Sequence, residues 1–265
     1  MMDFLIDVRS NEADTAHVRF GFELATRFGA HLTGLQVIAV DASLIALPEP
    51  LLILEDEEAF AHGRHAWWAK ICRDHGVDGA WEVRRGVHRR ILIRRASFAS
   101  LLIGRLHSTG SGNPFGTGIL ARVVLARVAP VILVPDQSAP SALRSILLTW
   151  NGSAVSMRAI RAALPFMARA RHITILAGDR HSRVRRGDAD ALLRNWLQRN
   201  SVVCDWIEMD DGVSPGETIC RIADEVRAEG IVMGAWGRSR LRELALGGTT
   251  RHLLSHSKVP LLISA

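Results

Sequence analysis

The residue types in this sequence that could do chemistry gather in one glycine-bearing stretch, residues 233–250. Gly234 and Gly237 permit a tight turn and let a ligand approach the main chain closely. Gly247 and Gly248 precede a predicted helix, whose free N–H groups and positive dipole end favour a phosphate. Taken alone, such glycines also fit an ordinary loop before a helix. The residues that would bind the phosphate are Met233, Gly234, Gly237, Gly247, Gly248, Thr249 and Thr250.

A further polar side chain is expected at the same place in the fold. Asn151 directly follows the apolar run 145–150, and Gly234 closes the apolar run 230–234. In an open parallel sheet, ligands bind beyond the carboxyl ends of the strands, near the point where the strand order reverses. The amide of Asn151 can both accept and donate a hydrogen bond at such an edge.

These residues resemble the phosphate-binding signature of the universal stress protein family. That signature is Gly, two residues, Gly, nine residues, Gly and a small hydroxyl residue, and Gly234, Gly237 and Gly247 match its glycines. Residues 151–153, Asn-Gly-Ser, are similar to the Asp-Gly-Ser that ends the family's first strand. The resemblance implies that Asn151 contacts the adenosine moiety of ATP or another adenine nucleotide, with or without Mg²⁺. The glycine loop would then bind the phosphates.

Two positions depart from the family pattern. Asn151 stands in place of the strand-end acid, and Gly248 stands where the family usually has Ser or Thr. A neutral hydrogen bond is about half as strong as a charge-assisted one, so the adenosine contact is weakened. The N–H of Gly248 remains, and Thr250 matches a frequent family threonine. We therefore expect binding that persists but is weaker.

The two halves of the chain match each other, which indicates a tandem repeat. Residues 100–105 and 230–235 are each an apolar strand that leads through a glycine-bearing loop to a helix. A proline and a last apolar strand follow in both halves. Residues 136–141 between the halves are small, polar and contain proline, as a linker would. We expect two domains, residues 1–138 and residues 144–265.

The fold class follows from the alternation of short apolar runs with helical segments such as 13–28. Continuous apolar strands indicate parallel sheets that are buried on both faces. The prediction is an α/β protein of two tandem doubly wound domains. The resemblance implies five-stranded, mainly parallel sheets of the adenine nucleotide alpha hydrolase type. It also implies that the last strands, 131–134 and 261–263, pair within one chain as a pseudo-dimer. Further pairing of whole chains as a homodimer stays open.

The first half departs much further from the signature. Arg9 replaces the strand-end acid, and His107 follows Gly104 where a second glycine is expected. The loop 108–118 is rich in glycine but is off the spacing. We predict a degenerate nucleotide site here, at which Arg9 and Arg105 could draw a polyanion.

Charge and composition exclude several classes of partner. The formal net charge is +6, carried mainly by arginine. The densest run, residues 84–95, has the pattern of an amphipathic helix with a solvated basic face, and no nucleic-acid motif accompanies it. No apolar run approaches the length of a membrane span, and no secretory signal opens the chain. The expected protein is cytoplasmic, with neither nucleic acid nor membrane as a partner.

The remaining histidines, tryptophans and cysteines that could be functional are better explained by structural roles. The pairs His252/His256 and His62/His65 lack further metal ligands, which predicts surface or packing roles. Trp67 and Trp68 fit a core or an interface better than a base-stacking platform. The three cysteines are far apart and resemble buried apolar residues.

Three functions compete at this point. In the first, ATP or a related nucleotide occupies the second half and biases binding of an unknown protein partner. In the second, the sites have decayed and the protein is an interaction scaffold. The third is an enzyme, at most a weak ATPase, for which the glycine loop lacks a visible general base or metal-binding carboxylate.

Overall fold

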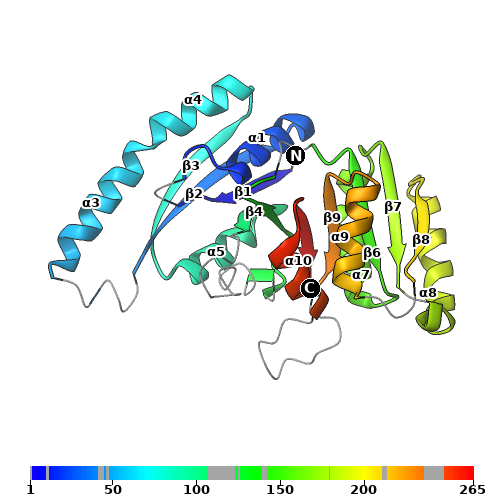
Figure 1. Ribbon diagram of the computed structural model, residues 1–265. Coiled ribbons are helices and arrows are strands. Elements are labelled where there is room, and N and C mark those ends of the chain that lie inside the picture. Colours follow the sequence, from blue (N-terminus) through cyan, green and yellow to red (C-terminus); the bar gives the residue numbers. More distant parts are fainter. Residues whose placement is uncertain are drawn as a thin grey trace. The chain divides into compact units, whose positions relative to one another are not determined.

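The computed structural model describes residues 2–9, 12–40, 45, 48–106, 123–124, 126–138, 142–178, 180–210, 214–235 and 248–265, with the backbone alone at 180–186. The chain divides into two compact units, and among the described residues the division along the sequence falls between Asp136 and Gln137. Unit 1 contains β1 to β5 and unit 2 contains β6 to β10 (Figure 1). Each unit is an α/β body with a parallel sheet, as the apolar runs predicted.

The sheet of unit 1 has the strand order β3-β2-β1-β4-β5 among its described residues. Its apolar strands are buried almost completely, with Phe4, Leu5 and Ile6 at most 1% exposed. Successive strands run outward from β1 to β3, and β4 then lies on the other side of β1. The order therefore reverses between β1 and β4. The strands are β1 (Asp3–Asp7), β2 (His31–Ala39), β3 (Gly79–Gly86), β4 (Leu101–Leu106) and β5 (Val131–Pro135).

The helices of unit 1 begin and end largely where the sequence signals indicate. The first begins at Ala16 rather than Ala13, because Thr15 takes the extended backbone of an N-cap. It ends where Gly29 adopts a left-handed conformation with φ 58°. Two further helices follow one another along the chain with only Arg64 between them (Figure 1). The described helices are α1 (Ala16–Phe28), α3 (Pro50–Gly63), α4 (His65–His75) and α5 (His88–Ala96).

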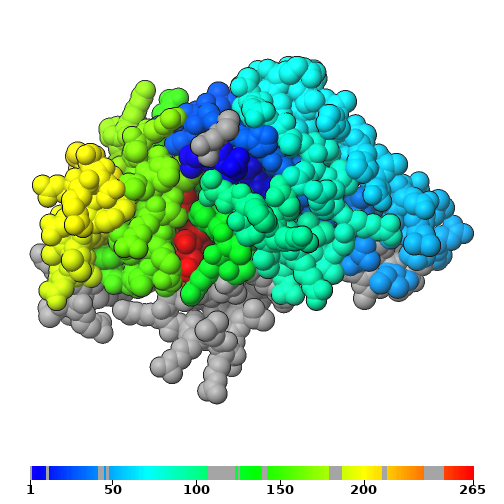
Figure 2. All heavy atoms as spheres, turned by 180° about the vertical axis from the view of Figure 1, so that it is seen from behind, coloured from blue at the N-terminus to red at the C-terminus, as the bar shows by residue number. Residues whose placement is uncertain are grey.

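The prediction of one helix over residues 84–95 is wrong at its start. Arg84 and Arg85 belong to β3, which pairs with β2 up to Gly86, and the helix begins only at His88. Inside the helix Leu92 is buried, whereas Val87 ahead of it is 48% exposed. The arginines of α5 are mostly solvated, as expected. Figure 2 shows the part of the chain around α5 in blue-green.

An aromatic cluster fills the space between α4, α1 and β3 in unit 1. The Trp68 ring is 1% exposed and lies 4.9 Å from Phe22 and 5.4 Å from Trp81, between ring centroids. Trp68 is thus a core residue, as the sequence indicated. Gly34 of β2 lies beneath it, and an added Cβ there would come within 2.7 Å of Trp81 and 2.8 Å of Trp68.

Unit 2 repeats this topology with the order β10-β9-β6-β7-β8 among its described residues. The order reverses between β6 and β9, as it does between β1 and β4. Its strands are β6 (Ser145–Trp150), β7 (His172–Ala177), β8 (Asp205–Glu208), β9 (Gly230–Gly234) and β10 (Leu261–Ser264). Its helices are α7 (Ala154–Met167), α8 (Arg180–Arg199), α9 (Pro215–Glu225) and α10 (Gly248–His256).

The pairing of the two last strands as a pseudo-dimer stays a prediction, as do the exact domain boundaries. None of the helices in the described parts of the chain combines the length and apolar character that a membrane span requires.

Candidate functional site

The candidate site of unit 2 lies where its strand order reverses. β6 and β9 are parallel neighbours, and their carboxyl ends are at Trp150 and Gly234. α10 connects β9 to the parallel strand β10, so it must run antiparallel to both. Its N-terminus at Gly248 therefore faces the edge at which β6 and β9 end. The topology thus brings Asn151, Gly234 and the start of α10 to one edge of the sheet.

Asn151 is exposed, and its side-chain oxygen already has a partner. Oδ1 accepts a hydrogen bond from the N–H of Ser153 at 3.1 Å. Ser153 in turn caps α7, because its Oγ accepts from the N–H of Ser156 at 3.1 Å. The oxygen of Asn151 thus shapes the turn into α7, and its NH₂ group makes no hydrogen bond to the described part of the chain. An aspartate could make the same turn.

Gly234 serves a packing role that the sequence alone did not indicate. An added Cβ would lie 2.7 Å from the nitrogen of Ser156 and 2.8 Å from the carbonyl carbon of Val155. Those atoms are backbone of α7 and cannot swing aside. Glycine is required here because the end of β9 lies directly against the first turn of α7.

The start of α10 is open. An added Cβ at Gly248 would meet nothing within 4 Å. Thr249 is half-buried, whereas Thr250 is 6% exposed and Met233 is 3% exposed. Met233 can therefore offer a ligand only its main chain, and the accessible groups are those of Gly248 and Thr249. Gly237 and Gly247 lie outside the described residues.

The possible metal ligands do not cluster. The described part of the chain holds no group of three or more His, Cys, Asp or Glu side chains placed for a metal ion. The rings of His252 and His256 stack with centroids 4.3 Å apart. His256 Nδ1 donates to the carbonyl of His252 at 2.9 Å, which commits that nitrogen to the helix. Burial raises the pKa of the Cys72, Cys204 and Cys220 thiols, so these stay protonated and unreactive at neutral pH.

The first strands of the two units can be equated through their main-chain hydrogen bonds. The N–H of Ser100 donates to the carbonyl of Asp3, and the N–H of Glu229 donates to that of Ser145. Asp3 and Ser145 are therefore equivalent positions. Counting along both strands, Arg9 takes the place of Asn151, as the sequence comparison predicted.

The same method corrects the comparison of the glycines. Leu102 N–H donates to the carbonyl of Pro130 and Ile231 N–H donates to that of Pro260, so Leu102 and Ile231 are equivalent. Arg105, not Gly104, then takes the place of Gly234. The sequence match was wrong by one residue because continuous apolar strands look alike in either register.

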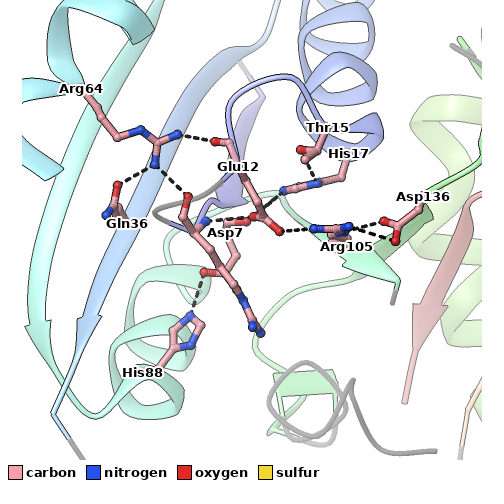
Figure 3. Close-up of polar contacts among 10 residues, drawn as sticks. Asp7, Glu12, Thr15, His17, Gln36, Arg64, His88, Arg105 and Asp136 are labelled. Carbon is pink, nitrogen blue, oxygen red and sulfur yellow. Dashed lines mark hydrogen bonds and ion pairs between the residues drawn. The ribbon is translucent and has the colours of Figure 1, made fainter. Parts of the chain in front are cut away.

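At this edge of unit 1 lies a buried carboxylate, that of Glu12, which is 1% exposed (Figure 3). Its Oε1 accepts a hydrogen bond from Arg105 Nη1 at 3.0 Å, and its Oε2 accepts from the main-chain N–H of Arg9 at 2.9 Å. Arg105 also donates through Nε and Nη2 to Asp136, and these bonds, ahead of those to Glu12, raise the pKa of Arg105. The expectation that Arg105 draws a polyanion is corrected, since its charge is already paired.

Arg64 ties the loop that carries Glu12 to the sheet. Its Nη1 donates to the carbonyl of Arg9 at 2.8 Å and to Oε1 of Gln36 at 2.7 Å, and its Nη2 donates to the carbonyl of Glu12. The guanidinium also lies over the Trp67 ring, 4.5 Å from its centroid. Arg64 is 8% exposed, so one buried cation satisfies three main-chain or side-chain oxygens.

His17, on α1, is the last member of the hydrogen-bond network around Glu12, and it is fully buried. Its Nε2 donates to the carbonyl of Asp7 at 3.2 Å and lies 3.5 Å from Glu12 Oε2. Its Nδ1 then accepts from the hydroxyl of Thr15 at 3.0 Å. Burial lowers the pKa of His17, although the nearby Glu12 opposes this, so the ring is neutral at pH 7. On the other side of β1, His88 Nε2 contacts Asp7 Oδ1 at 2.7 Å.

Comparison with known proteins identifies the second half. The universal stress protein family model matches residues 142–264. The second half is therefore similar to the proteins of that family. A search of curated proteins finds no match.

Solved structures extend the likeness to both units. The structure of a universal stress protein from Archaeoglobus fulgidus covers 99% of this chain and 95% of its own, with 17% identity and a TM-score of 0.75. A putative universal stress protein from Pseudomonas aeruginosa covers 100% of this chain and 93% of its own, with 15% identity and a TM-score of 0.63. A universal stress protein in complex with cAMP covers 47% of this chain and 99% of its own, with 24% identity and a TM-score of 0.38. Both units of the chain thus share the fold of these solved structures.

Sequence reasoning missed the residues that fill the strand-end edge of unit 1, Glu12, His17 and Arg64. One signal was available. The segment between β1 and α1, residues 8–15, is longer than residues 151–153 between β6 and α7. The extra residues include an acid, Glu12, in a unit whose matching positions carry Arg9 and Arg105.

Acidification is expected to destabilise unit 1 through His17. The folded pKa of His17 is below its ordinary 6.5, so below pH 6.5 the unfolded state binds more protons than the folded state. The free energy of unfolding therefore falls as pH decreases from 6.5, by at most about 1.4 kcal/mol per pH unit for one group. Urea denaturation at pH 7.5 and 5.5 measures this loss. His17→Gln should reduce it, and an unchanged pH dependence in that variant would contradict the assignment.

Proposed function

We propose that unit 2 binds an adenine nucleotide at the reversal point between β6 and β9, and that the bound nucleotide biases the interaction with a protein partner. One observation carries the proposal. The topology brings the open N-terminus of α10 at Gly248 to the edge where Asn151 presents its NH₂ group. A helix N-terminus suits the phosphates, and the amide suits the sugar or base. The glycine spacing of the intervening loop supports the same ligand.

A Mg²⁺ ion would arrive with the nucleotide rather than through protein ligands. The described residues offer no cluster of carboxylates for a metal, and Mg²⁺ commonly binds through phosphates with few protein contacts. ATP as the ligand is consistent with the cytoplasmic location that the sequence predicts.

A scaffold role is favoured for unit 1 by a specific observation. Its equivalent edge is filled by the Glu12 carboxylate and by the side chain of Arg105. We therefore propose one nucleotide per chain, bound in unit 2. Purified protein should release an adenine nucleotide on denaturation, identified by mass. A preparation that releases none and does not bind added ATP would leave the scaffold function for the whole chain.

Asn151→Asp is expected to tighten ATP binding. The new carboxylate can still accept from the Ser153 N–H, and its charge strengthens a hydrogen bond to the adenosine moiety. The gain should be about 1 kcal/mol, roughly fivefold in affinity. Calorimetric titration of both proteins at one salt concentration measures it. Equal affinities for wild type and variant would remove Asn151 from the site.

A further inference from the structure

The donors around the Glu12 carboxylate are those of an oxyanion-binding site. Each carboxylate oxygen receives one hydrogen bond, from Arg105 Nη1 at 3.0 Å or from the Arg9 N–H at 2.9 Å (Figure 3). The Glu12 side chain is 2% exposed. A charge can be buried to this extent only when a partner charge and hydrogen bonds replace water.

The position of this carboxylate is as informative as its contacts. Arg9 and Arg105 occupy the places that Asn151 and Gly234 occupy in unit 2, so the carboxylate lies at the edge proposed for the nucleotide there. Glu12 reaches it on the longer segment between β1 and α1. Arg64 fixes that segment by donating to two of its carbonyls, those of Arg9 and Glu12.

We propose that the strand-end edge of unit 1 is an oxyanion cradle, built by Arg105 and the Arg9 N–H, whose resident occupant is the chain's own Glu12 carboxylate. The cradle suits a small carboxylate or phosphate group, and Glu12 excludes such ions from solution. The Glu12 carboxylate thus occupies the cradle of unit 1 at every concentration of nucleotide.

Removing the occupant tests the proposal. Glu12→Ala leaves Arg105 and the Arg9 N–H without this partner and should lower the melting temperature. The Arg105 side chain is 28% exposed, so a solvent ion can reach the cradle. Sodium formate or inorganic phosphate should then raise the melting temperature of Glu12→Ala relative to sodium chloride at equal ionic strength. Wild type should show only the general stabilisation that phosphate gives through its exclusion from protein surfaces, so the response of Glu12→Ala is measured relative to wild type.

Two further variants separate the cradle from general salt effects. Asp14→Ala removes an exposed acid of the same segment, paired with Arg19 at 2.8 Å, and should behave like wild type. Adding Arg105→Gln to Glu12→Ala should abolish the response to formate and phosphate. If Glu12→Ala is unfolded in chloride, we expect formate to restore the circular dichroism signal of the folded protein.

The proposal is overturned if neither ion affects Glu12→Ala beyond chloride, or if Asp14→Ala responds equally. A response to phosphate alone would identify the cradle as one for tetrahedral anions, and a response to formate alone as one for planar carboxylates. These measurements contain no nucleotide, so their outcome does not depend on whether unit 2 binds ATP.

Discussion

Gly34→Ala should destabilise unit 1 by about 1–3 kcal/mol, the usual cost of forcing an extra methyl group into a packed core. The added Cβ would lie 2.7 Å from Trp81 Cε3 and 2.8 Å from Trp68 Cη2. Trp68 cannot move aside easily, because Phe22 packs on it with ring centroids 4.9 Å apart. The strain would therefore pass into β2 and α4.

A matched glycine provides the control for this substitution. An added Cβ at Gly63, the last residue of α3, meets nothing within 4 Å. Gly63→Ala should leave stability unchanged or raise it by up to about 1 kcal/mol, as alanine does in helices. Urea denaturation followed by tryptophan fluorescence compares the two. Equal stabilities for Gly34→Ala and Gly63→Ala would show that the aromatic cluster is looser than described.

Gly237→Val or Gly247→Val should reduce ATP affinity by a factor of ten to several hundred while the protein stays folded. Both residues lie outside the described residues, so this expectation rests on the glycine spacing. A branched side chain would keep phosphate oxygens away from the main-chain N–H groups. Each lost hydrogen bond to a charged group costs about 1.5–3 kcal/mol.

Gly248→Ser is the control within the same loop, since open space surrounds its Cβ position. It should bind ATP at least as tightly as wild type, because its hydroxyl can donate to a phosphate. Gly234 is unsuitable for this test, because a side chain there would collide with the backbone of α7. Calorimetry with ATP measures all variants, and full affinity in Gly237→Val and Gly247→Val would rule out the loop.

The sequence indicated the α/β fold and the repeat because both depend on residue patterns that survive in one chain. Apolar runs such as 145–150 became buried parallel strands, and Trp68 became a core residue. The helix over 84–95 was mispredicted because arginines with interspersed apolar residues suit a strand as well as a helix. Pairing with β2 decided in favour of the strand up to Gly86.

The side chains that lie at the carboxyl ends of the strands were harder to predict, because their positions depend on strand register and on long-range contacts. A shift of one residue between β4 and β9 put Arg105, not Gly104, in the place of Gly234. Glu12 meets Arg105 only after folding brings residues far apart in sequence together. No local pattern records such a pair. The glycines did indicate a helix start nearby, although α10 includes Gly248 rather than following it.

Titration of nucleotide-free protein with ATP tests the central claim most directly. The account predicts saturable binding with one ATP per chain, strengthened in Asn151→Asp and strongly weakened in Gly237→Val. Absence of binding by both wild type and Asn151→Asp, or two equivalent sites per chain, would contradict it.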